Sequence, residues 1–222
     1  MSKFSVAIDG PAGAGKSSIA KKIASILNCI YVDTGAMYRT VGYYCIKNNI
    51  DYNNEKQVEE ICDRVKLKLK LEDGVQQIFL DEVNVSELIR TPEASMAASK
   101  VAMYKAVRES LVKKQQEIAA NQSLVMDGRD IGTVVLPDAT LKIFLVATVF
   151  ERANRRYKEY LAKGQNPCFE SLQKEIEDRD YQDSNREISP LKKADDAVEI
   201  DTTNMTIDEV IETIVSMLKE QL

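Results

Sequence analysis

Eight residues near the start of the chain, Gly10–Ser17, have the spacing GxxxxGK(S/T) of a phosphate-binding loop. Glycines let the backbone wrap closely around an anion, because a Cβ would obstruct both the dihedral angles and the approach. We expect Lys16 to reach the β- and γ-phosphates of a nucleoside triphosphate and Ser17 to hold Mg²⁺. The alternative is a glycine-rich turn that binds nothing.

The residues on either side of this loop have the patterns that the motif requires. The apolar run at 4–8 is typical of a short strand, and apolar residues recur after the loop at helical spacing. In a strand–turn–helix unit, backbone N–H groups and the helix N-terminus provide positive potential at the turn. The sequence therefore predicts a nucleoside triphosphate site.

A second polar loop, Asp127–Gly132, directly follows an apolar run at 124–126. In an open α/β sheet, ligands collect at the carboxyl ends of the strands. We expect Asp127 to act on Mg²⁺ or its water ligands, and Arg129 and Asp130 to face a second ligand. The stretch 33–39 follows the apolar run 30–32 and has the same position and chemistry. A structural turn closed by an Arg–Asp pair is the alternative for the loop at 127–132.

Arginine is concentrated in a few places, whereas lysine is spread over the whole chain. The forked guanidinium suits phosphate recognition and neutralises charge in a transition state. So many arginines beside a triphosphate loop indicate more than one phosphate-bearing ligand, although any single one could equally form a surface or structural salt bridge. Eight of the ten arginines fall in four groups: Arg39; Arg108 and Arg129; Arg152, Arg155 and Arg156; Arg179 and Arg186.

Helical spacing relates these arginines to apolar faces. Arg108 borders the apolar stripe of a helix predicted near 104–120, and the stripe of a helix after 168 continues as Arg179 and Asp183. An inward face that becomes charged indicates a cleft or a buried ion pair. The group at 152–156 has the spacing i, i+3, i+4 and precedes a turn at 164–167. We expect a helical hairpin that closes as a lid at about 152–170, the alternative being an exposed basic helix.

The elements that must position these residues form an α/β pattern. Apolar runs predict strands at 4–8, 30–32, 124–126, 141–146 and 197–200, and the helical patterns between them predict a parallel, doubly wound five-stranded sheet flanked by helices. Residues 65–71 alternate as a half-solvated strand, Asp73–Gly74 predicts a turn and 75–80 a return strand. We expect a core at 1–39 and 96–222 and an inserted antiparallel subdomain at 40–95. Thr206 and Glu209 predict a capping box before a C-terminal helix that packs on the core.

Composition narrows the chemistry. The 222 residues contain no His and no Trp, and the four cysteines lack CxxC spacing, which argues against a zinc site or a disulfide framework. The net charge of −5 argues against nucleic acid or an anionic membrane surface as partner. The chain contains no apolar run of membrane-helix length and no signal-peptide pattern. We expect a cytoplasmic monomer with reduced thiols.

Several stretches together make the chain similar to bacterial-type cytidylate kinases, of the nucleoside monophosphate kinase group of P-loop kinases. The resemblance covers essentially the whole length. Its motifs are IDGPAGAGKSS at 8–18, DTGAMYR at 33–39, IRTPE at 89–93, DGRDIGTVVLPDA at 127–139, KIFLVA at 142–147 with ERANRR after it, and RDYQDSNR at 179–186.

The resemblance implies transfer of the ATP γ-phosphoryl group to CMP or dCMP with Mg²⁺. It implies that 40–95 is the monophosphate-binding part, that Arg39, Arg129 and Arg186 grip the acceptor phosphate, and that Arg179 and Asp183 reach the ribose. Cytosine would lie among Thr34, Ser99, Arg108 and Asp130; the family also has Ser at the position of Thr34, which keeps the hydroxyl. The ATP phosphates would be held by Gly10, Pro11, Ala12, Gly13, Ala14, Gly15, Lys16, Ser17 and Ser18.

The implied mechanism needs no general base, because the acceptor phosphate oxygen is already an anion. Catalysis would rest on in-line placement and on charge neutralisation. The groups expected to act there are Lys16, Arg129, Arg152, Arg155, Arg156 and Arg179, with Mg²⁺ held by Ser17 and, through water, by Asp127.

Two other functions fit the phosphate-binding loop. One is a P-loop kinase for UMP, AMP or a small molecule such as shikimate. A sugar or shikimate kinase has no evident need for Arg108 and Asp130. The other is a nucleotide-switch protein, against which stand the arginine-rich lid and the absence of a guanine-reading NKxD pattern. The sequence leaves the preference between CMP and dCMP open.

Overall fold

The computed structural model describes residues 3–72 and 75–222, and the chain divides into two compact units. Unit 1 comprises Met1–Ile30 and Ser123–Leu222, and unit 2 comprises Tyr31–Gln122. Unit 2 contains the segment 40–95 that the sequence predicts as an insertion and extends beyond it at both ends. That this shorter segment is a monophosphate-binding subdomain stays a prediction.

The larger sheet has five strands in the order β2-β6-β1-β7-β8. They are β1 (Ser5–Asp9), β2 (Ile30–Asp33), β6 (Leu124–Gly128), β7 (Leu141–Val146) and β8 (Val198–Asp201). The pairs β1–β6, β1–β7 and β7–β8 are parallel. β6 is buried along its whole length, as expected for a central strand covered on both faces. The predicted five-stranded parallel sheet is confirmed, and each strand lies within two residues of its expected bounds.

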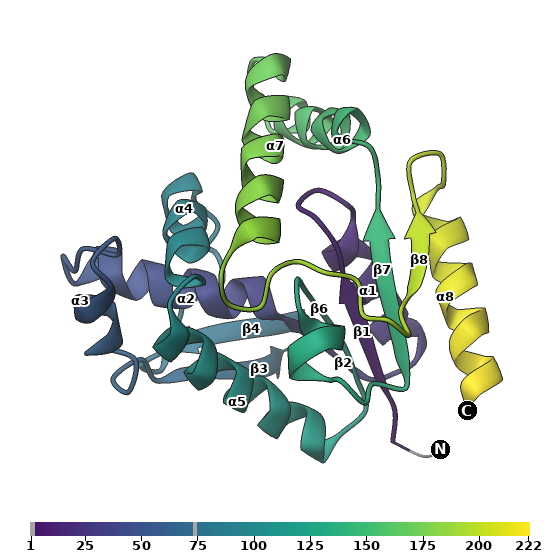
Figure 1. Cartoon of the computed structure of the whole chain (residues 1–222), viewed down its shortest axis with the longest axis horizontal. Coiled ribbons are helices and arrows are strands. Elements are labelled where there is room, and N and C mark those ends of the chain that lie inside the picture. Colours follow the sequence, from purple (N-terminus) through teal and green to yellow (C-terminus); the bar gives the residue numbers. More distant parts are fainter. Residues whose placement is uncertain (1–2, 73–74) are drawn as a thin grey trace. The chain divides into compact units, whose positions relative to one another are not determined.

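The helices of unit 1 follow the strands (Figure 1). α1 (Lys16–Ile26) contacts β6 and α8 (Ile207–Gln221), and the predicted capping box of Thr206 and Glu209 begins α8. α6 (Val149–Ala162) and α7 (Phe169–Asn185) pack together as the predicted helical hairpin. Closure of this hairpin as a lid stays a prediction.

A five-residue π-helix, η1 (Ile131–Val135), follows β6 and has no counterpart in the sequence-based prediction. Its wide turn is visible in the hydrogen bond from the Leu136 N–H to the Ile131 carbonyl, which spans five residues at 2.7 Å. Periodicity could not reveal it, because a single turn is too short to produce a repeat. π-turns of this kind are frequent at functional sites.

In its described residues, unit 2 has a small antiparallel sheet and four helices. The sheet has the order β3-β4-β5, with β3 (Leu67–Glu72), β4 (Val75–Leu80) and β5 (Val83–Asn84), and Leu67 lies opposite Leu80. The two longer strands confirm the prediction, β5 is additional, and the expected turn at Asp73–Gly74 lies outside the described residues. The helices are α2 (Thr34–Lys47), α3 (Glu55–Glu59), α4 (Pro92–Val101) and α5 (Lys105–Asn121), and α2 packs on α4.

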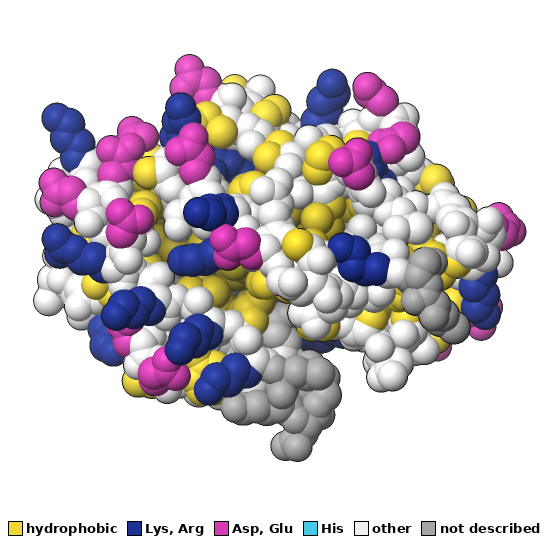
Figure 2. Space-filling view, turned by 90° about the horizontal axis from the view of Figure 1, so that it is seen from below, with side chains coloured by type: hydrophobic (Ala, Val, Ile, Leu, Met, Phe, Trp, Pro, Cys, Tyr) yellow, Lys and Arg dark blue, Asp and Glu magenta, His cyan; other side chains and the backbone are white. Residues whose placement is uncertain are grey.

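The surface carries charges of both signs. On the face drawn in Figure 2, Lys and Arg side chains are interspersed with Asp and Glu side chains. Within residues 3–72 and 75–222, every helix is too short or too polar to be a candidate for spanning a membrane.

Candidate active site

The phosphate-binding loop ends where α1 begins, and this helix start differs from others in the chain. α1 follows Gly15, which has a φ of 85° and no side chain with which to cap the helix. Because its first N–H groups have no intrahelical partners, an uncapped start can donate them to an anion. By contrast, five other helices start at a side chain that accepts one of their own first N–H groups, whereas α5 and α7 start without one. The capping residues are Asp33 for α2, Asn54 for α3, Thr91 for α4, Thr148 for α6 and Thr206 for α8.

Two glycines of the loop are required by packing as well as by the turn. Gly10 and Gly13 have φ values of 146° and 77°, which disfavour other residues. A Cβ on Gly10 would lie 2.1 Å from the Leu145 carbonyl oxygen at the end of β7, and a Cβ on Gly13 would lie 3.2 Å from the Cβ of Arg152. The loop therefore packs closely against β7 and the first turn of α6.

Lys16 is buried at the start of α1, and its Nζ donates to the Pro11 carbonyl at 2.7 Å. Burial holds the pKa of this ammonium well below its usual value, and the charge of Arg129 lowers it further, whereas Asp127 opposes the shift. A bound triphosphate would favour the charged form, since an opposite charge stabilises it. The local field is thus arranged for a polyanion.

Ser17 and Asp127, predicted as Mg²⁺ ligands from separate motifs, lie side by side. The Ser17 Oγ donates to the Asp127 Oδ2 at 2.9 Å, and Asp127 is buried at the end of β6. Hydroxyl and carboxylate oxygens are ligands that Mg²⁺ prefers, together with phosphate oxygens and water. The donor set fits that metal ion.

Asp9, at the end of β1, holds the loop after β6 and was given no role by the sequence. Its carboxylate accepts the N–H groups of Ile131 and Gly132 at 2.8 and 2.7 Å. Burial raises the pKa of this carboxyl to about 6, against the opposing effect of the two backbone hydrogen bonds. The available signal was an Asp closing a buried strand directly before Gly10.

Four residues predicted from two distant motifs form one cluster, which we call the acceptor cluster. Arg129 donates to Asp183 at 2.8 Å, and Arg186 lies 3.7 Å from Asp130. Burial of Asp183 raises its carboxyl pKa, but the charges of Arg129 and Arg179 outweigh this, and the pKa lies below its usual value. The fold therefore brings together the loop after β6 and the end of α7.

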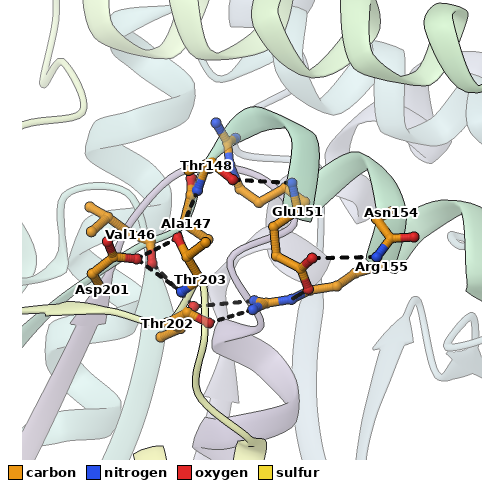
Figure 3. Close-up of polar contacts among 10 residues, drawn as sticks. Val146, Ala147, Thr148, Glu151, Asn154, Arg155, Asp201, Thr202 and Thr203 are labelled. Atoms are coloured by element: carbon orange, nitrogen blue, oxygen red, sulfur yellow. Dashed lines mark hydrogen bonds and ion pairs between the residues drawn. The ribbon is translucent and has the colours of Figure 1, made fainter.

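The three arginines of α6 differ in their surroundings. Arg152 is buried, with partners in three segments: the Ala147 carbonyl at 3.0 Å, the Ala12 carbonyl at 3.0 Å and Asp180 at 2.6 Å. Arg155 donates to Glu151 and to both oxygens of Thr202 (Figure 3). Arg156 lies 3.3 Å from Glu175 and has a side chain that is 35% exposed.

Arg179 lies in α7 of unit 1, and four further predicted residues belong to unit 2. Thr34 is buried at the start of α2, and Arg39 in the same helix is paired with Asp33 at 3.0 Å. Arg108 is buried in α5, where it donates to the Ala102 carbonyl at 3.2 Å and lies 5.6 Å from the ring of Tyr38. Ser99 is part-buried in α4.

The phosphate-binding loop connects β1, a strand of the parallel sheet, to α1, and this arrangement is typical of nucleotide-binding α/β proteins. Residues 6–220 match the family model described as cytidylate kinase. A curated cytidylate kinase of Leuconostoc mesenteroides subsp. mesenteroides is 50% identical over 222 residues, which cover 100% of this chain and 99% of the relative. Another, of Bacillus cytotoxicus, is 50% identical over 220 residues, covering 99% and 98%. The chain belongs to the cytidylate kinase family.

Among solved structures, the fold is similar to that of an uncharacterized protein from Eubacterium ventriosum ATCC 27560. The TM-score is 0.51 at 12% sequence identity, and the match covers 98% of this chain and 99% of the other. At this identity the likeness concerns the fold alone.

Proposed function

We propose that this protein is a cytidylate kinase that transfers the γ-phosphoryl group of ATP to CMP or dCMP, giving ADP and CDP or dCDP. The observation that carries the proposal is the 50% identity with cytidylate kinases over the entire chain. The arrangement of Lys16, Ser17 and Asp127 at the phosphate-binding loop supports the same chemistry.

On the donor side, Gly10–Ser18 bind the ATP phosphates through backbone N–H groups and Lys16. Ser17 would hold Mg²⁺ directly, and Asp127 would hold it through a water molecule. Bound with ATP, Mg²⁺ supplies positive charge to the β- and γ-phosphate oxygens. The side-by-side position of the two oxygen ligands supports this assignment.

On the acceptor side, Arg39, Arg129 and Arg186 bind the phosphate of CMP, and Arg179 and Asp183 bind the ribose. Thr34, Ser99, Arg108 and Asp130 recognise cytosine, whose amino group donates and whose O2 and N3 accept. A site with these groups rejects uracil, because uracil would leave some of the site's buried polar atoms unpaired. The acceptor cluster in unit 1 supports the assignment of its four members.

The transferred group develops charge that the protein must neutralise. Lys16, Arg129, Arg156 and Arg179 are the cationic groups that we assign to the phosphates, with Arg155 as a further candidate in α6. The acceptor oxygen is an anion, so the chain needs no general base, and positioning and electrostatics account for the acceleration. Arg152 is treated separately below.

We further propose a cytoplasmic monomer whose partners are nucleotides, with neither nucleic acid nor a membrane among them. The four cysteines are free thiols, a state that a reducing compartment preserves. Sedimentation of the purified protein, with and without nucleotides, tests the oligomeric state.

The experiment that tests the function measures ADP formation from ATP with Mg²⁺ and, in parallel, CMP, dCMP, UMP, AMP or no acceptor. Rapid turnover with CMP and dCMP only is the expected result. Equal turnover with UMP would retain the kinase and refute the cytosine-reading role of Arg108 and Asp130. Turnover that is independent of any added monophosphate would refute the proposal.

A further inference from the structure

Arg152 is fully engaged with groups of the protein. All three kinds of guanidinium nitrogen have a partner: Nε the Ala147 carbonyl, one terminal nitrogen the Ala12 carbonyl, and the other the carboxylate of Asp180. Its side chain is 4% exposed, compared with 26% for Arg155 and 35% for Arg156. Moving Arg152 onto a phosphate would break two hydrogen bonds and the ion pair with Asp180.

The bond to Ala12 has a consequence for the phosphate-binding loop. In a trans peptide the carbonyl and the following N–H point in opposite directions. Because Arg152 holds the Ala12 carbonyl, the N–H of Gly13 is directed away from Arg152. The same segment lies against Arg152 at Gly13, where a Cβ would be only 3.2 Å from the Cβ of Arg152. One side chain thus sets both the position and the orientation of this peptide.

We propose that Arg152 is a positioning residue for ATP binding, acting through the Ala12–Gly13 peptide, and that Asp180 on α7 holds Arg152 in that role. Arg152 does not touch the phosphates. The inference rests on the proposed function and revises the expectation that all three arginines of α6 meet the transferred group. It assigns Asp180, a residue outside the expected site, to the donor side.

The same contacts explain why an arginine is needed at this position. A lysine would keep the positive charge but could not reach two carbonyls and a carboxylate in three directions. In contrast, a side chain that binds phosphate mainly through its positive charge can be replaced by lysine with a smaller loss. The two roles are therefore separable by a substitution that preserves charge.

The test compares Arg152→Lys, Asp180→Asn and the double variant. The matched control is Arg64→Lys, because Arg64 is exposed and belongs to unit 2, whereas Arg152 belongs to unit 1. The dissociation constant of Mg·ATP is measured without acceptor, together with the ¹⁵N–¹H resonance of Gly13. We expect Arg152→Lys to weaken ATP binding about tenfold, a loss typical of one charge-assisted hydrogen bond. Asp180→Asn should weaken it about threefold and shift the Gly13 resonance, and the double variant should bind no more weakly than Arg152→Lys.

Steady-state kinetics complete the comparison. The KM for ATP should rise in both single variants while the KM for CMP stays within twofold. The proposal is overturned if Asp180→Asn leaves ATP binding and the Gly13 resonance unchanged, or if Arg152→Lys lowers kcat with unchanged ATP affinity. Because Asp180→Asn retains Arg152, it decides the question even if Arg152→Lys fails to fold. Because ATP binding is measured without CMP, its result does not depend on which acceptor the protein uses.

Discussion

Two loops of unit 1 follow neighbouring parallel strands, β1 and β6, and use their backbones in opposite ways. In the phosphate-binding loop, cationic side chains hold carbonyls: Lys16 holds that of Pro11 and Arg152 that of Ala12. In the loop after β6, the Asp9 carboxylate instead holds two N–H groups. We therefore expect the N–H groups of the first loop to bind an anion. In the second loop, two N–H groups are already bound to Asp9, so we expect side chains to contact the ligand.

This difference assigns different tasks to the two loops. Backbone N–H groups recognise any phosphate and do not depend on which side chains are present. Side chains such as Arg129 and Asp130 can distinguish one ligand from another through charge and hydrogen-bonding pattern. We expect substitutions in the first loop to change catalysis with every acceptor, and substitutions around the second to change which acceptor is used.

The largest expected effect comes from Lys16→Met, which removes the only charged side chain of Gly10–Ser17 and keeps most of the side chain's length. Turnover with CMP should fall by at least about 10³-fold, because the charge acts on the phosphates in the transition state. Initial rates of ADP formation measure this effect, and thermal unfolding provides the control for folding. A rate within tenfold of the original protein would contradict the assigned role.

Arg186→Ala should affect the second loop. Arg186 is buried, approaches Asp130 at 3.7 Å and donates to the Ser189 carbonyl at 2.5 Å. We expect kcat/KM for CMP to fall by about 10²-fold, the loss of a charge-assisted contact to the acceptor phosphate together with its support of Asp130. The dissociation constant of ATP, measured alone, should change little. Normal turnover, or an equal loss of ATP binding, would remove the distinction between the loops.

Asp9 connects the loops, since it ends β1 and holds the N–H groups after β6. Its pKa is raised from 3.8 to about 6 by burial. A raised carboxyl pKa means that the folded state binds the proton more tightly. The stability contributed by Asp9 is therefore complete below pH 3.8 and is lost as the pH rises through 6, by about 3 kcal/mol.

Asp9→Asn removes this titration, so the other ionisable groups cancel in a comparison of the two proteins. The free energy of unfolding in urea, original minus variant, should decrease between pH 4 and pH 7. A difference that is constant with pH, or that increases, would show that burial does not dominate at Asp9.

The smallest expected effect is on selectivity in Asp130→Ala. Absolute rates will fall for all acceptors, because Arg186 loses its buried partner. The informative quantity is the ratio of kcat/KM for CMP to that for UMP, which should fall about tenfold as the group that recognises the cytosine amino group is lost. An unchanged ratio would move cytosine recognition away from the second loop.

The sequence-based predictions were most accurate for features that depend on residues close together along the chain. The phosphate-binding loop, the parallel strands and the capping box at Thr206 depend on neighbours within one turn or one strand, and all of these elements were predicted. The part played by Asp9 depends on residues more than 120 positions away along the chain, and the π-turn at Ile131–Val135 is too short to produce a repeat, so neither was predicted. The roles of individual site residues stay predictions that the experiments above address.

The arginines show the same division. Their type and helical spacing indicated a cleft or buried ion pairs, and Arg129 and Arg186 do pair with Asp183 and Asp130. Their contact with a phosphate stays a prediction. Spacing could not rank the three arginines of α6, because their partners lie on α7, in the loop after β8 and in the phosphate-binding loop.

By itself, the sequence determined the chemistry that is available: a loop that binds phosphates, arginines clustered in a few places of a chain without histidine, and strands in an α/β order. These properties are local, because they follow from residue type, from glycine dihedral freedom and from hydrophobic periodicity. The tertiary structure alone decided which backbone groups each loop keeps. That choice depends on side chains delivered from distant segments, Asp9 to one loop and Arg152 to the other, and a buried polar group takes whatever partner the fold places beside it.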